Sequence, residues 1–432
     1  MSLKLRSKNV WGRLGMGYET YRIADLIDEI AMGPFGSNIK VSCFVDSGVP
    51  VLNGSNLEGF SLSEKTFRYV TREKADSLNK ANAHRGDIVI THRGTLGQIV
   101  FIPQDSKYDR YVISQSQFRV RCNDKVLPEY LVYYFHTPIG QHKLLSNASQ
   151  VGVPALARPS STFQQIEVVL PELSIQKRVV EIISTIQKKI VNNQELNDNL
   201  QQQAQALFKK WFVDNPDAIS WKEGTFSNLI EKTISGDWGK DSPSGNNTEM
   251  VYCIRGADIP EVRTGNKGKM PTRYILPKNY AAKQLVDGDI VVEISGGSPT
   301  QSTGRAAAVS DALLARYDKG MVCTNFCKAL KPRAGYSMYV YYYWQYLYDR
   351  DIFFSYENGT TGIKNLDING FIETEPIVIA PEDLVEKFDA VCQTVFSKIY
   401  ANGMENEQLA LVRDTILPKL MSGEIDVSAV QL

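Results

Sequence analysis

Two long stretches of the chain repeat hydrophobic residues at the spacing of one face of a helix. The first runs from Glu172 to Phe212 and the second from Glu382 to Met421. In both, apolar residues recur every three or four positions between polar ones. Each stretch follows a short apolar run closed by proline, Pro171 or Pro381, and proline favours the first turn of a helix. The pattern therefore predicts two helices, each about 60 Å long.

The two stretches also match each other in sequence. A shift of 209 residues carries Asn193 onto Asn402 and Asn197 onto Asn406. A buried asparagine in an apolar seam fixes the register of paired helices at some cost in stability. We therefore expect the helices to pair, although two unrelated helices, each packed on its own domain, remain an alternative. The expected pairing residues are Ile186, Ile190, Asn193, Asn197, Leu200, Leu207, Val395, Ile399, Asn402, Asn406, Leu409 and Ile416.

The segments that precede the two stretches repeat as well, at shifts of 202 to 210 residues. Gly86–Ile90 corresponds to Gly288–Val292, and Asn53–Leu57 corresponds to Arg255–Ile259. An ordered repeat with small changes in the shift indicates two copies of one domain that differ by loop insertions. Further matches are Gly33–Gly36 with Gly236–Gly239, Ser114–Gln115 with Thr324–Asn325, and Gly152 with Gly362.

Within each copy the local signals are those of strands and short helices. Gly-Asp before an apolar run indicates a turn that leads into a buried strand, and a short helix is expected at Pro128–Phe135 and at Tyr339–Tyr348. The predicted fold class is α+β, with two tandem α/β domains, each followed by a long helix. The helices are expected to pair as an antiparallel coiled-coil-like spacer with a pseudo-twofold internal repeat. The predicted segments are 1–171 (with an N-terminal arm at 1–20), 172–212, 213–381 and 382–432.

Composition places the chain among ordinary globular proteins. Its 432 residues are 43% hydrophobic and 22% charged, and the formal net charge is zero. Zero net charge argues against a protein that coats nucleic acid indiscriminately, but it permits a local basic patch. The six cysteines form no CxxC pair, so we expect reduced thiols and no zinc. No apolar run approaches the length of a membrane span and no secretory segment opens the chain, so we expect a cytoplasmic protein.

Catalytic signatures are missing from the sequence. Gly265–Lys269 lacks the spacing of a phosphate-binding P-loop, and Gly94–Gly97 is too short for a dinucleotide fingerprint. Asn215–Asp217 lacks the second proline and the aromatic residue of an amino-methyltransferase motif. We therefore expect no catalytic residue, no metal and no cofactor in this chain.

The residue pattern instead favours recognition of nucleic acid. A glycine loop follows the buried strand in each copy, at Thr91–Gly97 and at Ser295–Gly304. Arginine can bond guanine O6 and N7, and glutamine can bond adenine, so Arg93 and its neighbours suit base readout. Each such residue could instead be a solvated loop residue, and the tyrosine run suits helix packing better than base stacking. The candidate DNA contacts are Asn53, Ser55, Thr91, Arg93, Thr95, Gln98, Gln115, Gln117, Arg255, Ser298, Gln301, Thr303, Arg305 and Asn325.

The whole chain resembles the DNA-specificity subunit of Type I restriction–modification systems. The resemblance rests on the ordered duplication, the two Gly-Asp-Ile-Val strands with their glycine loops, and the two long helices. Gln176–Val180 and Ile416–Ile425 look typical of that family, whereas Glu382–Lys387 departs from its usual Gln-x-x-Ile start.

The resemblance implies a non-catalytic subunit with two target recognition domains. Each domain would read one half of a bipartite, asymmetric DNA site, and the helices would set the gap and dock two modification (methyltransferase) subunits. Those partners would bring S-adenosylmethionine and methylate adenine, and restriction subunits would add translocation and cleavage with ATP and Mg²⁺, in defence against foreign DNA. Two alternatives remain, a stand-alone duplicated DNA-binding regulator and a protein-binding adaptor, the latter favoured by the neutral net charge.

Overall fold

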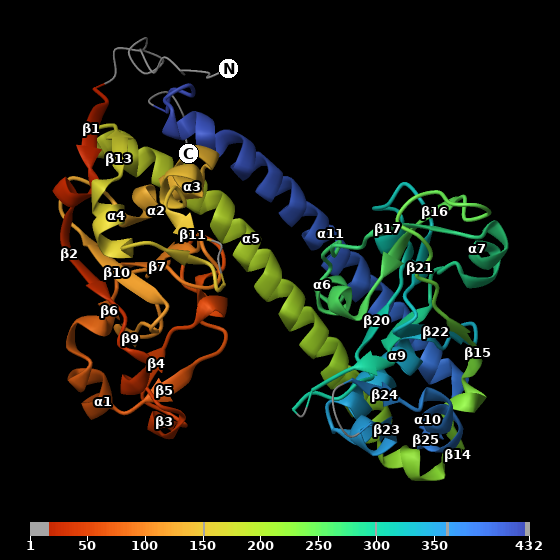
Figure 1. Ribbon diagram of the computed structural model, residues 1–432. Coiled ribbons are helices and arrows are strands. Elements are labelled where there is room, and N and C mark those ends of the chain that lie inside the picture. The colour runs from red at the N-terminus through yellow and green to blue at the C-terminus, as the bar shows by residue number, and fades with distance from the viewer. Residues whose placement is uncertain (1–16, 150–151, 299, 360–362, 428–432) are drawn as a thin grey trace. The chain divides into compact units, whose positions relative to one another are not determined.

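The computed structural model describes residues 17–149, 152–298, 300–359 and 363–427 (Figure 1). The chain divides into two compact units. The first unit extends to Gln187 and resumes at Leu411, and the second unit comprises Lys188–Ala410. Each unit thus combines one predicted domain with part of both long helices. The four predicted segments instead treat each long helix as a separate piece of the chain. Residues 1–16 of the predicted arm and Gly362 lie outside the described residues.

A four-stranded antiparallel sheet forms the centre of each unit. In the first unit the spatial order is β2-β10-β7-β8, and in the second it is β15-β22-β18-β20. The same order in both units confirms the predicted internal repeat, because the matched Gly-Asp-Ile-Val runs form β7 and β18. The strands are β2 (Ile27–Met32), β10 (Gln117–Cys122), β7 (Ile88–Thr91), β8 (Ile99–Phe101), β15 (Ile230–Ser235), β22 (Cys327–Pro332), β18 (Ile290–Glu293) and β20 (Ala306–Ala308).

Smaller sheets surround each central sheet. The first unit has a five-stranded sheet, in the order β3 (Phe44–Val45), β5 (Arg68–Val70), β4 (Val49–Val51), β9 (Arg110–Val112) and β6 (Asn82–His84). The second has a three-stranded sheet of β17 (Thr272–Ile275), β16 (Glu249–Ile254) and β21 (Met321–Cys323). In each unit the first strand pairs with the strand that precedes the long helix, β1 (Glu19–Arg22) with β13 (Glu167–Leu170) and β14 (Lys222–Thr225) with β25 (Pro376–Ile379).

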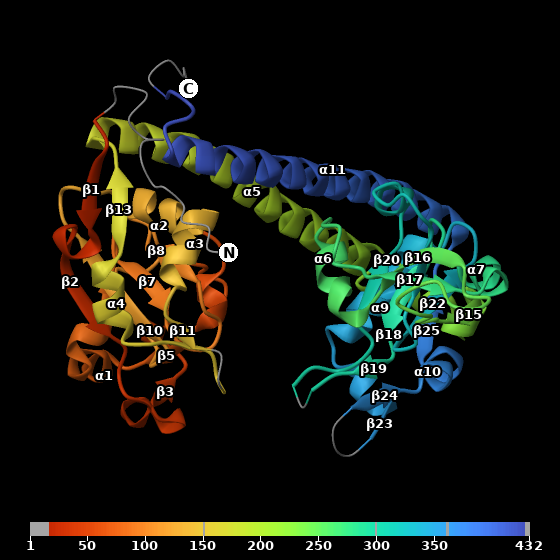
Figure 2. The same ribbon diagram turned by 45° about the horizontal axis from the view of Figure 1, so that its top comes forward.

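The short aromatic helices are buried in the cores of their units. In the first unit α2 (Pro128–His136) buries Tyr130–Phe135 in the core and lies between the central sheet and α5, as Figure 2 shows. The next helix, α3 (Pro138–Leu144), buries only Gly140 and Leu144. In the second unit α9 (Ser337–Tyr348) buries three of its six tyrosines and packs the other three, partly buried, against the same core. Trp344 Nε1 donates to the carbonyl of Gly304 at 2.8 Å. The tyrosine run therefore packs in the core. The remaining short helices are α1 (Arg72–Ser77), α4 (Pro159–Gln165), α6 (Ile259–Arg263), α7 (Pro277–Lys283), α8 (Asp311–Leu314) and α10 (Ile368–Thr374).

The long helices are α5 (Leu173–Phe208), which continues as a π-helical turn over Lys209–Val213, and α11 (Glu382–Met421). In the first unit Leu417 and Leu420 of α11 share one apolar core with Ile183 of α5 and with the central sheet. The alternative in which each helix packs only on its own domain is therefore wrong. No helix in the described part of the chain is long and apolar enough to cross a membrane.

The family-like start of α5 ties this helix to the first domain. Gln176 is buried, and its side-chain oxygen accepts a hydrogen bond from the backbone N–H of Leu127 at 3.0 Å. Its Nε2 donates to the carbonyl of Pro171 at 2.9 Å. The 209-residue shift places Val385 at this position in α11, and Val385 is buried in the second core. At this position α5 is therefore attached to its domain by the hydrogen bonds of Gln176, and α11 by the apolar packing of Val385. This is also the turn at which the sequence of the second helix departs from the family pattern.

Candidate nucleic-acid interface

Four loops of the first unit meet at one end of its central sheet, where β2 and β7 end and β10 and β8 begin. They are residues 33–36, 92–97, 114–116 and 152–156, which we call the first loop end. The His92 N–H donates to the carbonyl of Ser116 at 2.8 Å, and the Leu156 N–H donates to the carbonyl of His92 at 2.9 Å. The glycine loop is therefore held between the turn before β10 and the hairpin of β11 (Ala148–Ser149) and β12 (Ala155–Leu156).

The second unit builds the same arrangement from the matching segments. They are residues 236–239, 294–298, 300–304, 324–326, 357–359 and 363–366, which we call the second loop end. The Leu366 N–H donates to the carbonyl of Ile294 at 2.9 Å, as Leu156 does to His92. Here β19 (Ser295–Gly296) pairs with β24 (Lys364–Leu366), which also pairs with β23 (Glu357–Asn358).

One glycine in each loop end is required by a close backbone approach. A Cβ added to Gly33 would lie 1.9 Å from the carbonyl oxygen of Ser114, and one added to Gly236 would lie 1.9 Å from that of Thr324. Any larger residue would push the two segments apart. The sequence repeat pairs these residues with each other, so the structure preserves the same contact in both copies.

Five of the predicted DNA contacts have exposed side chains at the two loop ends. Among the described residues, no hydrogen bond or ion pair engages the Arg93 guanidinium. The pKa of the neighbouring His92 is lowered, chiefly by burial, with a hydrogen bond from its ring to the carbonyl of Gln115 acting against that effect. Within the described part of the chain, the Arg93 guanidinium is therefore an unpaired cation at the first loop end. The five exposed residues are Arg93, Thr95, Gln115, Gln301 and Asn325.

Two further predicted contacts lie on a neighbouring turn of the first unit. Asn53 and Ser55 are exposed on a 3-10 turn, where the Asn53 side-chain oxygen accepts from the Ser55 N–H at 2.8 Å. Gln98 is half-buried and donates from Nε2 to the carbonyl of Gly54 at 3.0 Å. Gln98 thus connects this turn to the glycine loop, which leaves Asn53 and Ser55 available at the surface.

Three of the predicted DNA contacts, Thr91, Gln117 and Thr303, have buried side chains, which does not fit a role in contacting DNA. Gln117 has no exposed surface, and its Oε1 accepts from the Ser114 N–H at 2.9 Å. Thr91 donates to Gln98 at 3.0 Å. Thr303 donates to Glu357 from its hydroxyl at 2.9 Å. These three side chains hold the loops in shape, and we withdraw them from the set of DNA contacts.

The two predicted arginines of the second unit are occupied by carboxylates. Arg305 donates to Glu293 through two bonds of 2.8 Å, and this hydrogen bonding raises the pKa of Arg305. Arg255 donates to Asp258 at 2.9 and 3.0 Å. Ser298 is half-buried and bonds backbone to backbone with Gln301. Arg305, Arg255 and Ser298 thus stabilise the loops, whereas Gln301 and Asn325 remain exposed.

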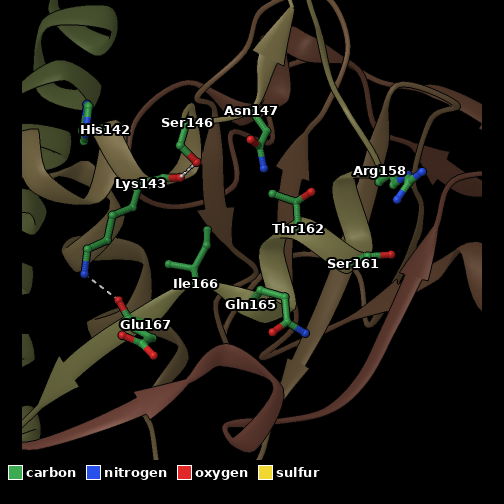
Figure 3. A pocket seen from close by; sticks show the side chains of 10 residues that line it. All are labelled: His142, Lys143, Ser146, Asn147, Arg158, Ser161, Thr162, Gln165, Ile166 and Glu167. Carbon is green, nitrogen blue, oxygen red and sulfur yellow. Dashed lines mark hydrogen bonds between the residues drawn. The ribbon is translucent and has the colours of Figure 1, made fainter.

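A basic pocket of 660 Å³ lies next to the first hairpin (Figure 3). Lys143 and Arg158 lie on opposite sides of it, and one acidic residue, Glu167, also lines it. The rest of the lining is His142, Ser146, Asn147, Ser161, Thr162, Gln165 and Ile166. Lys143 Nζ donates to the carbonyl of Glu167 at 2.5 Å, which orients the ammonium group. The sequence patterns pointed to none of these residues, because they come from α3, α4 and the segments between and after them. Two cations against the single carboxylate of Glu167 leave a net positive lining, which suits an anionic group such as a phosphate.

Comparison with known proteins shows which family the chain resembles. Residues 17–202 match the Type I restriction modification DNA specificity domain. The chain is also 24% identical, over 96% of its own length and 95% of the relative, to the Type I restriction enzyme MjaIX specificity subunit of Methanocaldococcus jannaschii. The chain is similar to the specificity subunits of Type I restriction–modification systems. Specificity subunits are non-catalytic DNA-recognition proteins, so the predicted resemblance and the role that it implies are confirmed.

Further relatives agree with this assignment. The Type I restriction enzyme HindI specificity subunit of Haemophilus influenzae is 24% identical over 79% of this chain and 87% of the relative. The crystal structure of a Type I restriction–modification S subunit from M. genitalium shares the fold, with a TM-score of 0.52, 15% identity and coverage of 97% of this chain and 99% of that one. The domain match ends at residue 202, and the internal repeat extends the same architecture to the second unit of this chain.

Proposed function

We propose that each loop end of this chain reads one half of a bipartite, asymmetric DNA site. One observation carries the proposal: the two loop ends share a backbone framework but expose different polar side chains. The exposed Arg93 and Gln115 of the first loop end correspond in sequence to Ser295 and Asn325 of the second. Two readers built on one scaffold would therefore select two different sequences.

In this proposal base contacts specify the sequence and phosphate contacts position the protein. Arg93 is our candidate for a bidentate contact to guanine in the major groove. The pocket between Lys143 and Arg158 is our candidate for a backbone phosphate that flanks the first half-site. In the second loop end, Gln301 and Asn325 are the candidates for base contacts.

We further propose that the paired helices set the gap between the half-sites and dock two modification subunits. The antiparallel asparagine pairs support a fixed register of the helices. Docking is supported by large apolar side chains that both helices leave exposed to solvent, since exposed apolar surface is typical of interaction sites. These residues include Val191 and Leu196 on α5 and Val391, Met404, Leu411 and Val412 on α11.

We assign S-adenosylmethionine to the modification subunits, and ATP and Mg²⁺ to restriction subunits, because specificity subunits recognise DNA and leave catalysis to their partners. Adenine methylation would then occur in both half-sites. The complex would act on DNA in the cytoplasm.

Methylome sequencing of the host, with and without the gene, tests this function. We expect adenine methylation at one bipartite site, lost on deletion, and co-purification of the chain with a methyltransferase. An unchanged methylome would contradict the proposal. Salt-dependent DNA binding by the isolated chain would then indicate a regulator, and its absence an adaptor.

A further inference from the structure

The hairpin at each loop end carries an exposed aliphatic residue at a matched position. Val153 is 57% exposed and Ile363 is 65% exposed, and the 210-residue shift that relates the two hairpins carries one onto the other. We propose that Val153 and Ile363 each contact the C5 methyl group of a thymine in the half-site read by their own unit. This inference rests on the proposed function and adds a class of base contact to it.

Backbone pairing holds each of these residues beside its glycine loop. In the first unit Ala155 pairs with Arg93, and the Gly94 N–H donates to the carbonyl of Pro154 at 2.9 Å. Paired strands lie about 4.8 Å apart, and Val153 is the residue before Pro154 and two residues before Ala155 on the strand that pairs with the Arg93 loop. Val153 is thus positioned to meet the same stretch of groove as the free arginine.

The second hairpin is held in the equivalent way. Asn365 pairs with Ser295, which stands where Arg93 stands in the first unit. Leu156 and Leu366, each three residues beyond the aliphatic residue, are both buried. The buried leucines anchor the return strands, while Val153 and Ile363 stay at the surface.

The chemistry of the surroundings favours DNA over a protein partner. A single exposed aliphatic residue is ordinary, whereas here both copies of a divergent repeat expose an aliphatic residue at the same position. Protein-docking patches are contiguous and apolar, whereas the neighbours of Ile363 on its hairpin are Asn358, Lys364 and Asn365. Val153 is followed by Pro154 and Ala155, and the strand that pairs with this segment carries the exposed, charged Arg93. In the major groove the thymine methyl group is the one apolar feature among hydrogen-bonding groups, and aliphatic side chains read it by contact.

The test uses the complete methyltransferase complex and the site that its methylome defines. Adenine methylation requires an A·T pair in each half-site, so each half contains at least one thymine. Each thymine is replaced in turn by deoxyuridine, which lacks only the methyl group, and the Kd of each duplex is measured. For the wild type we expect about a fourfold loss of affinity at one thymine of each half-site, from the burial of one methyl group (about 0.8 kcal/mol).

Val153→Ala and Ile363→Ala serve as matched controls for each other. Val153→Ala should abolish the thymine–deoxyuridine difference in the first half-site and keep it in the second, and Ile363→Ala should do the reverse. Val153→Thr, which keeps the shape of the side chain, should reduce the same difference.

Three results would overturn the inference: no sensitive thymine in the wild type, an unchanged difference in the variants, or loss of complex assembly with intact base discrimination. Failure of the proposed function looks different, because the wild type would then show no site-specific binding at all.

Discussion

Asn193 donates a hydrogen bond from Nδ2 to the Oδ1 of Asn406 at 2.9 Å, and Asn402 donates to Asn197 in the same way at 2.8 Å. The 209-residue shift interchanges these two bonds, because it carries Asn193 onto Asn402 and Asn197 onto Asn406. The order of the contacts makes α5 and α11 antiparallel, and all four side chains are buried. Within the second unit the four asparagines therefore form two hydrogen bonds that are related by the pseudo-twofold repeat and lie between apolar residues of the two helices. We call this pair of bonds the asparagine lock.

Replacement of Asn193 by alanine should destabilise the second unit by about 1–3 kcal/mol, because it leaves the buried Asn406 oxygen without its donor. Urea unfolding measures the loss. The double variant Asn193→Leu/Asn406→Leu should cost less than the sum of the two single changes. The exposed neighbour Asn192 provides the control, and Asn192→Ala should stay within about 0.5 kcal/mol of the wild type. Equal stability of Asn193→Ala and Asn192→Ala would show that the asparagine lock contributes nothing to the free energy of unfolding.

Arg93→Ala should relax one half-site and leave the other intact. A bidentate contact to guanine is worth about 1–3 kcal/mol of discrimination, so affinity for the wild-type site should fall at least several-fold. Kd values for a panel of single base-pair changes measure the effect. Arg72→Ala, at an exposed arginine on α1 outside the loop end, is the control. Equal weakening of Arg93→Ala on all sequences would identify Arg93 as a phosphate contact only.

Arg305→Ala should act on stability, in contrast to Arg93→Ala. Glu293 is only 6% exposed, and the change leaves its carboxylate without its bidentate partner. Breaking such a pair costs about 3–5 kcal/mol. The double variant Glu293→Gln/Arg305→Met should recover much of that loss in thermal or urea unfolding. If Arg305→Ala instead altered base preference at unchanged stability, its original assignment as a DNA contact would stand.

Asp258 should contribute stability that disappears in acid. Burial alone would raise the pKa of this carboxyl, but hydrogen bonds from the Arg255 side chain and from the N–H groups of Lys269 and Arg255 outweigh it and lower the pKa below its ordinary value of 3.8. Because the folded-state pKa is the lower one, the stabilisation is present above the ordinary value and is lost as the pH falls through the folded-state pKa.

The comparison of wild type with Asp258→Asn measures this contribution. The free energy of unfolding of the wild type should fall more steeply between about pH 5 and pH 2 than that of the variant. Parallel curves over this range would contradict the pairing of Asp258 with Arg255.

The long helices and the duplicated sheets were predictable because their signals are local or repeated. Forty residues of apolar periodicity identify α11, and the matched Gly-Asp-Ile-Val runs identify β7 and β18 whatever their surroundings. The asparagines stood out for the same reason, since polar residues interrupt an otherwise apolar seam at matched positions. These features follow from the spacing of residues along the chain.

Burial of polar side chains was not predictable in this way. Thr303 donates a hydrogen bond to Glu357, which lies 54 residues later in the chain. Arg305 donates to Glu293, which belongs to a preceding strand. The hairpins that carry Val153 and Ile363 could not be predicted from the sequence, because β11, β12 and β23 have only two residues each. Strands that short show no alternation of polar and apolar residues, although the match of Gly152 with Gly362 pointed to this segment.

The central claim is that the paired helices set the gap between the two half-sites. An insertion at Asn197 would break its hydrogen bonds to Asn402 and Ile399, so the lengthening belongs elsewhere. The boundaries between the two units fall at Gln187/Lys188 in α5 and at Ala410/Leu411 in α11. One heptad inserted at both places keeps the helix faces aligned and adds about 10 Å, which corresponds to about three base pairs.

The decisive measurement is the methylome of a host that expresses this lengthened chain with its methyltransferase partner, after co-purification has shown that the complex still assembles. The account predicts the same two half-sites with a gap longer by about three base pairs. Methylation at the original gap would contradict it.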